Sequence, residues 1–355
     1  MKSKKLSDKI KVNGNEIISS KKKCFIVAEI SANHGGDLNT MLKTIKKAKA
    51  VGADAVKIQS YQPETMTLNV KNKHFLINDK SIWKGKYLFD LYKEAFTPFK
   101  WHKKIFQAAK KEKILCFSAP FDISAVNLLE SLGCPIYKIA SPEIEDLRLI
   151  ERVARTKKPI IISTGVASEK DISVAIKICK KNKNYNVILL NCISSYPASP
   201  EELNLKHINK LKKYSRIVGY SDHSNTDEAC LTSVALGAKV VEKHFILNKK
   251  IKSHDKKFSY DASEFHNLVK NIRRVEKILG KEDVDKKKIL KKKLKTITRS
   301  IFFSRDIKKG KKISEFHIKS VRPGTGYPLK YFDKIIGKKA KKNCFKGQPV
   351  KEGDF

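Results

Sequence analysis

Short apolar runs alternate with segments of helical period along most of the chain. Between the apolar runs, apolar residues recur every three or four positions, as at Leu42, Ile45 and Ala48. Eight strand candidates that alternate with helices over about 250 residues predict a (β/α)8 TIM barrel. An open, doubly wound sheet is the alternative, but it more often has a glycine-rich phosphate loop after its first strand, and none follows the first strand here. The strand candidates are residues 24–30, 54–59, 114–118, 136–141, 159–163, 187–192, 216–220 and 239–244.

The segments outside this alternation divide the chain further. The first residues are rich in Lys and contain Asn13-Gly14, a dipeptide typical of hairpin turns. After the last strand candidate come a predicted helix around 263–279, a run of charges, and a region with short strand-like runs and many turns. We therefore expect an N-terminal extension with a hairpin (1–23), a barrel domain (24–280), a linker (281–297) and a small β-rich domain (298–355).

The connection after the second strand candidate is unusually long and aromatic. It runs from Tyr61 to about Pro98 and includes Trp83, Tyr87 and Tyr92. A disordered loop would be poor in aromatic residues, so we expect this segment to pack over the mouth of the barrel.

The strongly basic composition does not by itself indicate a nucleic-acid-binding protein. The chain has 76 Lys and Arg against 36 Asp and Glu, a formal net charge of +40. Only nine of the basic residues are Arg, and the Lys are spread over nearly every helical segment without an aromatic-interleaved groove. We therefore expect no nucleic acid and no membrane as partners, although the charge attracts anionic substrates. A non-enzymatic polyanion-binding protein is the alternative that the charge alone favours.

Cysteine usage and hydropathy predict a cytoplasmic protein. The seven Cys show no CxxC spacing and several lie inside apolar runs, as reduced core thiols do. The N-terminus has no apolar signal segment, and no apolar span reaches 18 residues.

Two His stand at the ends of neighbouring strand candidates. His223 follows the run 216–220, and His244 ends the run 239–244. Because a parallel barrel brings the carboxyl ends of its strands to one face, we expect both imidazoles to face one cavity. Two imidazoles, completed by water or substrate oxygen, are suited to one divalent cation. One such His alone would more often only cap a strand, but the pair favours the metal site.

Two Lys interrupt otherwise apolar strand candidates, Lys57 and Lys138. A buried ammonium needs an anion, and a phosphate or carboxylate surrounded by Ser hydroxyls is the natural partner. The alternative is the Schiff-base Lys of an aldolase or lyase, but a metal at this face can polarise a carbonyl instead. The strand ends also supply Glu29, Gln59, Ser118, Ser141, Glu143, Ser163, Tyr196 and Ser221.

Motifs in order along the chain resemble those of the sialic acid synthases. The resemblance runs from about residue 24 to the end, and the last sixty residues are similar to the SAF, or antifreeze-like, domain. Within the family, the chain is most similar to the pseudaminic acid synthases, on segments 81–102 and 252–261 and on Ser194-Ser195, where sialic acid synthases have an Asn. The matching motifs are AEISANHGG (28–36), GADAVKIQ (52–59), YKIASPE (137–143), ISTG (162–165), SSYPA (194–198), GYSDHS (219–224), ALGAKVVEKHF (235–245) and SVRPGTG (320–326).

The resemblance implies an enzyme that condenses phosphoenolpyruvate with an open-chain acetamido sugar. For the pseudaminic branch the sugar is 2,4-diacetamido-2,4,6-trideoxy-altrose, and the products are a nine-carbon 2-keto sugar acid and phosphate. An N-acetylneuraminate or legionaminic acid synthase is the nearest alternative, and a metal-dependent aldolase or lyase on the same barrel is a more distant one. The resemblance also implies a homodimer in which the C-terminal domain of one chain completes the active site of the other.

The resemblance assigns roles to the residues at the matching positions. The expected metal is Mn²⁺ or Mg²⁺, held by His223 and His244, with Glu29 as the acid/base residue. The third-strand Thr of the family falls at Ala119, beside Ser118. The implied phosphoenolpyruvate contacts are Lys57, Ser118, Lys138, Ser141, Ser163 and Ser221, and the implied sugar contacts are Gln59, Tyr196, Asp255 and Arg322.

Overall fold

The computed structural model describes residues 5–79, 81–280 and 295–355. The chain divides into two compact units, Met1–Gly280 and Lys281–Phe355, which are described separately below. Most of the predicted linker, residues 281–294, lies outside the described residues.

Eight parallel strands close into a barrel in the first unit, which confirms the predicted fold class. The strands follow one another around the barrel in chain order, with the last beside the first. Their apolar runs are buried because barrel side chains face either the interior or the surrounding helices. The strands are β3 (Phe25–Glu29), β4 (Ala55–Ser60), β5 (Leu115–Pro120), β6 (Tyr137–Ile139), β7 (Ile160–Ser163), β8 (Val187–Asn191), β9 (Val218–Asp222) and β10 (Val240–His244).

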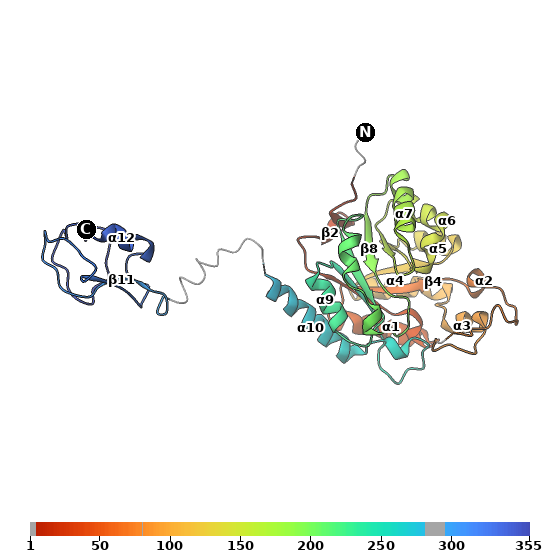
Figure 1. The fold of residues 1–355 in the computed structure, drawn as a ribbon. Helices are drawn as coiled ribbons and strands as arrows, with labels where there is room; N and C mark the ends of the chain where they lie inside the picture. Colours follow the sequence, from red (N-terminus) through yellow and green to blue (C-terminus); the bar gives the residue numbers. More distant parts are fainter. Residues whose placement is uncertain (1–4, 80, 281–294) are drawn as a thin grey trace. The chain divides into compact units, whose positions relative to one another are not determined.

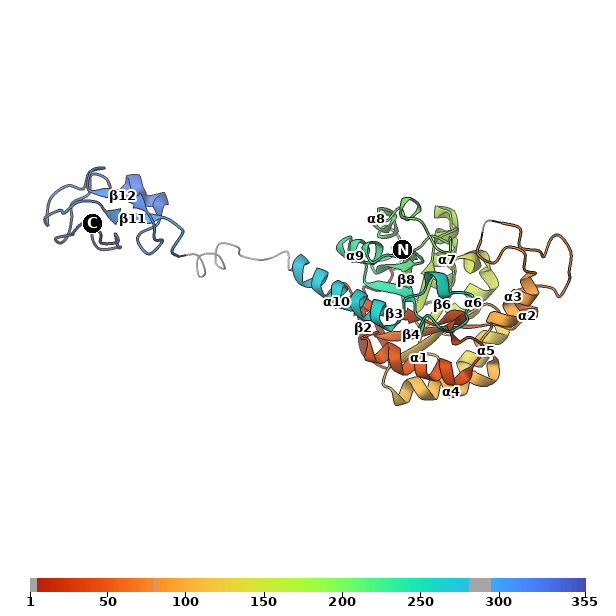
Figure 2. The ribbon, with the colours of Figure 1, turned by 90° about the horizontal axis from the view of Figure 1, so that it is seen from below.

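Helices surround the barrel and turn their apolar residues toward it (Figures 1 and 2). In α1, for example, the buried residues Met41, Thr44, Ile45 and Ala48 share one face, and the Asp37 carboxylate accepts hydrogen bonds from the first-turn amides of Asn39 and Thr40. The principal helices are α1 (Leu38–Ala50), α4 (Phe99–Lys111), α5 (Ile123–Ser131), α6 (Leu147–Arg155), α7 (Glu169–Lys181), α8 (His207–Leu211), α9 (Glu228–Ala235) and α10 (Ala262–Leu279). Short 3-10 turns are η1 (Ser31–His34), η2 (Pro142–Glu145), η3 (Pro200–Glu202) and η4 (Lys256–Phe258).

The predicted N-terminal hairpin is confirmed. Strands β1 (Lys9–Val12) and β2 (Asn15–Ser19) pair antiparallel around Asn13 and Gly14. Both turn residues have positive φ, 49° and 78°, as a two-residue hairpin turn of this kind requires.

The long aromatic connection contains two helices, α2 (Pro63–Met66) and α3 (Leu88–Ala95). Between them, an isolated antiparallel bridge joins Leu76 to Tyr87. The segment is therefore an ordered insertion at one edge of the barrel (Figure 2).

The second unit has a small core of its own, built around Ile301, Phe303, Ile318 and Ile335. Strands β11 (Ser300–Phe303) and β12 (Ile318–Val321) pair antiparallel, and η5 (Leu329–Tyr331) leads into α12 (Phe332–Ile335). Among the helices in the described part of the chain, none combines the length and apolar character that crossing a membrane requires.

Candidate active site

Two lysines and two carboxylates meet inside the barrel. Glu242 on β10 lies across the barrel from Lys138 on β6, and its two oxygens are 2.8 and 3.0 Å from Lys138 Nζ. Lys57 on β4 lies 2.6 Å from Glu29 Oε2 and 3.5 Å from Glu242 Oε1. All four side chains are no more than 5% exposed. They form what we call the interior charge cluster.

The interior charge cluster adds protein partners to the two lysines that the sequence analysis did not give them. Glu242 and Glu29 provide negative charge beside Lys57 and Lys138, and the binding of a substrate anion there stays a prediction. Glu242 was missed because it stands in a polar run, Glu242-Lys243-His244, in which the sequence alone does not show which residue faces the interior. Its alternation with His244 is the signal that could have found it, since residues two apart in a strand share a face.

Burial and mutual attraction set the pKa values of this cluster. Burial raises the pKa of Glu29 to about 7, although Lys57 opposes the rise. Burial would also raise the pKa of Glu242, but Lys138 and Lys57 hold it well below its ordinary value. Burial lowers the pKa of Lys138, whereas the carboxylates of Glu242 and Glu29 outweigh burial and raise the pKa of Lys57. The pKa of Glu29 therefore lies near neutral pH.

Three of the four predicted Ser lie beside this cluster. Ser221 donates to Glu242 Oε1 at 2.9 Å, and the Cys192 thiol contacts the hydroxyls of Ser141 and Ser163. The backbone comes close here: a Cβ on Gly165 would lie 2.7 Å from Cys192 Sγ. Cys192 is also within electrostatic reach of Lys138.

The structure does not bring Ser118 to this site. In the register of β4 and β5, Ser118 pairs with Ile58 instead of the inward-facing Lys57. Its hydroxyl donates to the carbonyl of Ile58 at 3.0 Å and lies 2.6 Å from Ser60 Oγ, which in turn contacts His102 on α4. The pleat of β5 therefore turns Ser118 toward the helices.

The two predicted metal ligands lie side by side at the carboxyl ends of β9 and β10. The ring centroids of His223 and His244 are 5.5 Å apart. His223 Nδ1 donates to the carbonyl of Ile193 at 2.7 Å, so its Nε2 carries the free lone pair. His244 Nδ1 is buried without a hydrogen-bond partner.

These two imidazoles fit a divalent cation, although they do not complete its coordination. Burial lowers the pKa of His223 to about 4 and that of His244 well below its ordinary value, so both rings are neutral, as metal ligation requires. Within the described ranges no group of three or more His, Cys, Asp or Glu could hold a metal ion. Any cation here would therefore need water or substrate oxygen as further ligands.

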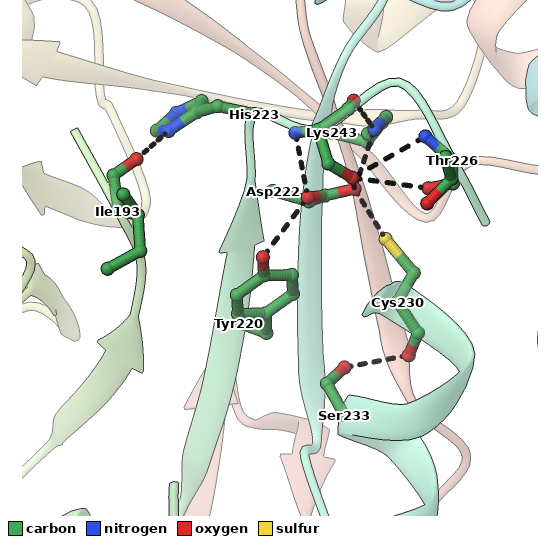
Figure 3. Close-up of polar contacts among 9 residues, drawn as sticks. Ile193, Tyr220, Asp222, His223, Thr226, Cys230, Ser233 and Lys243 are labelled. Atoms are coloured by element: carbon green, nitrogen blue, oxygen red, sulfur yellow. Dashed lines mark hydrogen bonds and ion pairs between the residues drawn. The ribbon is translucent and has the colours of Figure 1, made fainter. Parts of the chain in front are cut away.

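A buried ion pair joins Asp222 and Lys243, the residues that directly precede the two His in the chain (Figure 3). Lys243 Nζ lies 2.6 Å from Asp222 Oδ2, and both side chains are fully buried. Asp222 also accepts hydrogen bonds from Tyr220 and Cys230 and from the backbone amide of Ser224. Figure 3 shows Asp222 pointing toward this group while His223 extends toward Ile193. Successive residues at the ends of β9 and β10 thus alternate in role. His223 and His244 belong to the site, and Asp222 and Lys243 form the ion pair next to it.

A cavity of about 780 Å³ opens above His244. Three predicted sugar contacts, Gln59, Tyr196 and Asp255, line it together with His244. Trp83, Tyr92 and other residues of the aromatic insertion also line it, which agrees with the expectation that this segment packs over the mouth. Arg322 belongs to the other unit, so its role in sugar binding stays a prediction.

Glu143 is a further acidic residue in this cavity, and the sequence assigned it no role. It belongs to η2, directly after β6. Burial raises its pKa to about 7, and its Oε2 is buried without a hydrogen-bond partner. A carboxyl group in this state donates a hydrogen bond when protonated and accepts when ionised.

Comparison with known proteins identifies the family. The NeuB family matches residues 44–284, and the SAF domain matches residues 298–355. The chain belongs to the NeuB family. A pseudaminic acid synthase from Campylobacter jejuni is 46% identical over 94% of this chain and 97% of its own length. The Helicobacter pylori pseudaminic acid synthase is 41% identical over 93% of this chain and 97% of its own length.

A solved structure supports the same assignment. The N-acetylneuraminic acid synthetase from Leptospira borgpetersenii superposes with a TM-score of 0.72 at 34% identity, covering 81% of this chain and 96% of that protein. The two pseudaminic acid synthases that match nearly the whole of this NeuB chain are thus sugar-acid synthases.

Proposed function

We propose that this NeuB chain is a pseudaminic acid synthase. It condenses phosphoenolpyruvate with 2,4-diacetamido-2,4,6-trideoxy-altrose to a nine-carbon 2-keto sugar acid and phosphate. The observation that carries the proposal is the 46% and 41% identity to two pseudaminic acid synthases over nearly the full length. An N,N'-diacetyllegionaminic acid synthase from Campylobacter jejuni is 36% identical over a similar span, so that sugar is the second candidate.

The interior charge cluster suits the phosphoenolpyruvate half of this reaction. Lys57 and Lys138 supply positive charge for a phosphate and a carboxylate, and Ser141, Ser163 and Ser221 supply hydroxyl donors beside them. Carbon 3 of phosphoenolpyruvate bonds to the aldehyde carbon of the sugar, water adds its oxygen at carbon 2, and the bond from carbon 2 to the phosphate oxygen breaks. Glu29, with a pKa of about 7, takes up and returns protons in these steps.

His223 and His244 are the residues that hold the divalent cation, Mn²⁺ or Mg²⁺, in this proposal. Their neutral rings and the unpartnered Nδ1 of His244 support it. A cation there supplies Lewis-acid polarisation of the aldehyde oxygen.

The acceptor sugar occupies the cavity above the His pair. Gln59 reaches it from the carboxyl end of β4, and Tyr196 and Asp255 reach it from the connections after β8 and β10. Arg322 completes the sugar site from the SAF domain of a second subunit in a homodimer. The seven Cys, all buried and free, suit a reducing cytoplasm.

Turnover with defined substrates tests the proposed function. Purified protein is incubated with Mn²⁺, phosphoenolpyruvate and either the diacetamido trideoxy sugar, its legionaminic counterpart or N-acetylmannosamine, and phosphate release and product mass are followed. We expect fastest release with the diacetamido trideoxy-altrose. Faster turnover of N-acetylmannosamine would reject the pseudaminic branch. Trapping of pyruvate or sugar on Lys57 or Lys138 by borohydride would instead support the aldolase alternative.

A further inference from the structure

The cavity above His244 has two walls of different character. The carboxyl ends of the barrel strands and the connections that follow them contribute polar residues, including Gln59, Glu143 and Asp255. The aromatic insertion contributes Asp79 and Ser81 but mostly apolar side chains: Met66, Ile77, Ile82, Trp83, Leu88 and Leu91. A ligand that fills this space therefore meets hydrogen-bonding groups from the barrel and a largely apolar surface from the insertion.

The position of Trp83 relative to the His pair follows from its contacts with neighbouring aromatic rings. Its ring centroid is 5.7 Å from that of Tyr196 and 6.4 Å from that of Phe258. Tyr196 lies 4.3 Å from the ring of His223, and Phe258 lies 4.8 Å from that of His244. Trp83 is thus separated from the His pair by one aromatic ring, that of Tyr196 or Phe258. An acceptor whose aldehyde reacts beside the His pair presents its far end to Trp83.

The polar edge of the indole is already engaged. Trp83 Nε1 donates to the backbone carbonyl of His254 at 3.3 Å. His254 Nε2 in turn lies 2.8 Å from Glu94 Oε2 on α3, and Lys86 Nζ lies 2.6 Å from the same oxygen. These contacts tie the insertion to the barrel connection before η4. Trp83 therefore offers the cavity an apolar surface, without a free donor.

We propose that Trp83 is a specificity-determining residue that packs against apolar substituents at the far end of the acceptor sugar. The inference rests on the proposed function. It adds to that function a residue whose contacts favour a sugar with a methyl group and an N-acetyl methyl at its far end over a sugar with hydroxyl groups there. A hydroxyl at the same place loses its hydration against the face of the indole, which offers it no hydrogen bond, so the more polar sugar binds less well.

The first test is the selectivity of two Trp83 variants. The ratio of kcat/KM for the diacetamido trideoxy sugar to that for N-acetylmannosamine is measured for the wild type, Trp83→Leu and Trp83→Gln. We expect Trp83→Gln to lower this ratio at least about tenfold and Trp83→Leu to keep it within about threefold, because Leu restores an apolar surface. The KM for phosphoenolpyruvate should not change. An equal loss for both sugars in Trp83→Gln would mean a merely structural role and overturn the proposal.

Trp101 offers a matched control and a second readout. The chain has two Trp, and Trp101 packs edge-on against His34, 5.5 Å between centroids, and does not line the cavity. Trp101→Phe should leave the selectivity ratio unchanged and make Trp83 the sole indole fluorophore. The probes are the alditols made by reducing each sugar, which have no aldehyde to react. We expect a saturable change in Trp83 emission, at about tenfold lower concentration for the diacetamido alditol.

The two proposals can fail separately. Wild-type protein that releases no phosphate with any sugar would overturn the proposed function, and the alditol titration would still test Trp83 directly. Binding of the diacetamido alditol without a change in Trp83 emission, or equal affinity for both alditols, would overturn the role of Trp83 even where turnover is as proposed.

Discussion

Glu242 links the two lysines of the interior charge cluster. It contacts both Lys57 and Lys138, and it also accepts the hydrogen bond of Ser221. A buried carboxylate of this kind is held by its partners, and each partner would be a costly unpaired charge without it. Its removal should therefore affect both folding and the binding of an anionic substrate.

We expect Glu242→Gln to lower the free energy of unfolding by about 3 kcal/mol and to abolish turnover, because it leaves Lys138 buried without its carboxylate partner. Urea denaturation and phosphate release measure the two effects. Glu151→Gln is the control, since Glu151 pairs with Arg155 on the helix surface and should change stability by less than about 1 kcal/mol. Equal effects of the two substitutions would contradict the central role of Glu242.

The carboxyl of Glu143 predicts a pH dependence of stability. Its pKa rises from 4.5 to about 7 on folding, so between these values the folded protein holds a proton that the unfolded chain has released. Stability from this group is fully present below about pH 4.5 and is lost as the pH rises to about 7. Because Glu143 is not fully buried, solvent weakens this effect, and the loss in the free energy of unfolding is on the order of 2 kcal/mol.

The neutral variant Glu143→Gln should be less sensitive to pH across this window than the wild type, as measured by urea denaturation at intervals between pH 4.5 and 7.5. The exposed neighbour Glu145 provides the control substitution, Glu145→Gln. A wild-type pH profile that is retained unchanged in Glu143→Gln would show that Glu143 ionises as freely in the folded protein as in the unfolded chain.

The His pair predicts a measurable metal affinity. Replacing His223 or His244 by Ala removes one of two imidazole ligands from a rigid strand end, so the affinity for Mn²⁺ should fall at least about a hundredfold while the fold is kept. Calorimetric titration of chelator-treated protein measures the affinity, and circular dichroism checks the fold. Full affinity or near-full activity of either variant would remove the metal-site assignment.

At the scale of elements, a buried ion pair joins the carboxyl ends of β9 and β10. The register pairs Lys243 with Asp222, so the two strands carry the supporting ion pair on one face and the site residues on the other. Lys243 also lies 4.2 Å from the ring centroid of Tyr260, beyond the end of β10. The strand ends that carry His223 and His244 are thereby fixed to each other and to the connection before α10.

Lys243→Met should lower the free energy of unfolding by about 3 kcal/mol, because Asp222 keeps its charge in a fully buried place without its cation. A matched control exists in Lys158, which lies 2.6 Å from Glu130 and 5.8 Å from the ring of Tyr137 but is about 30% exposed. Lys158→Met should cost about 1 kcal/mol or less. Denaturation curves of the two variants decide, and a larger loss in Lys158→Met would reject this reasoning.

At the scale of the whole molecule, the proposed function draws on two separate units. The barrel unit contains the charge cluster, the His pair and the cavity, and the SAF unit contains Arg322. The proposed homodimer explains why a small domain of this kind is attached: its guanidinium can donate to an acetamido oxygen in the partner's cavity.

Mixing two inactive variants tests this exchange. In a heterodimer of a His244→Ala chain and an Arg322→Ala chain, a swapped arrangement leaves one site without either lesion. The isolated mixed dimers then have about half of the wild-type activity, since one of their two sites is intact. Phosphate release is measured after the mixed species is isolated with two different affinity tags. Proven heterodimers without activity would mean that each SAF domain serves its own barrel.

The sequence by itself determined the fold class, the succession of eight strands and the residues that stand at their carboxyl ends. These are local properties, because an apolar run followed by polar residues predicts a strand and its end independently of the rest of the chain. It also placed Lys57, Lys138, His223 and His244 at one face of the barrel, since parallel strands end on the same side.

Only the tertiary structure decided which side chains turn inward and which of them meet. A strand alternates its side chains between two faces, and the face that becomes the interior is chosen when the barrel closes. For that reason Ser118, expected beside the lysines, points to the helices, whereas Glu242 reaches Lys138 from the opposite wall, 104 residues away in the chain. Contacts across a closed barrel join residues that no sequence spacing relates, and the charge of this interior depends on them.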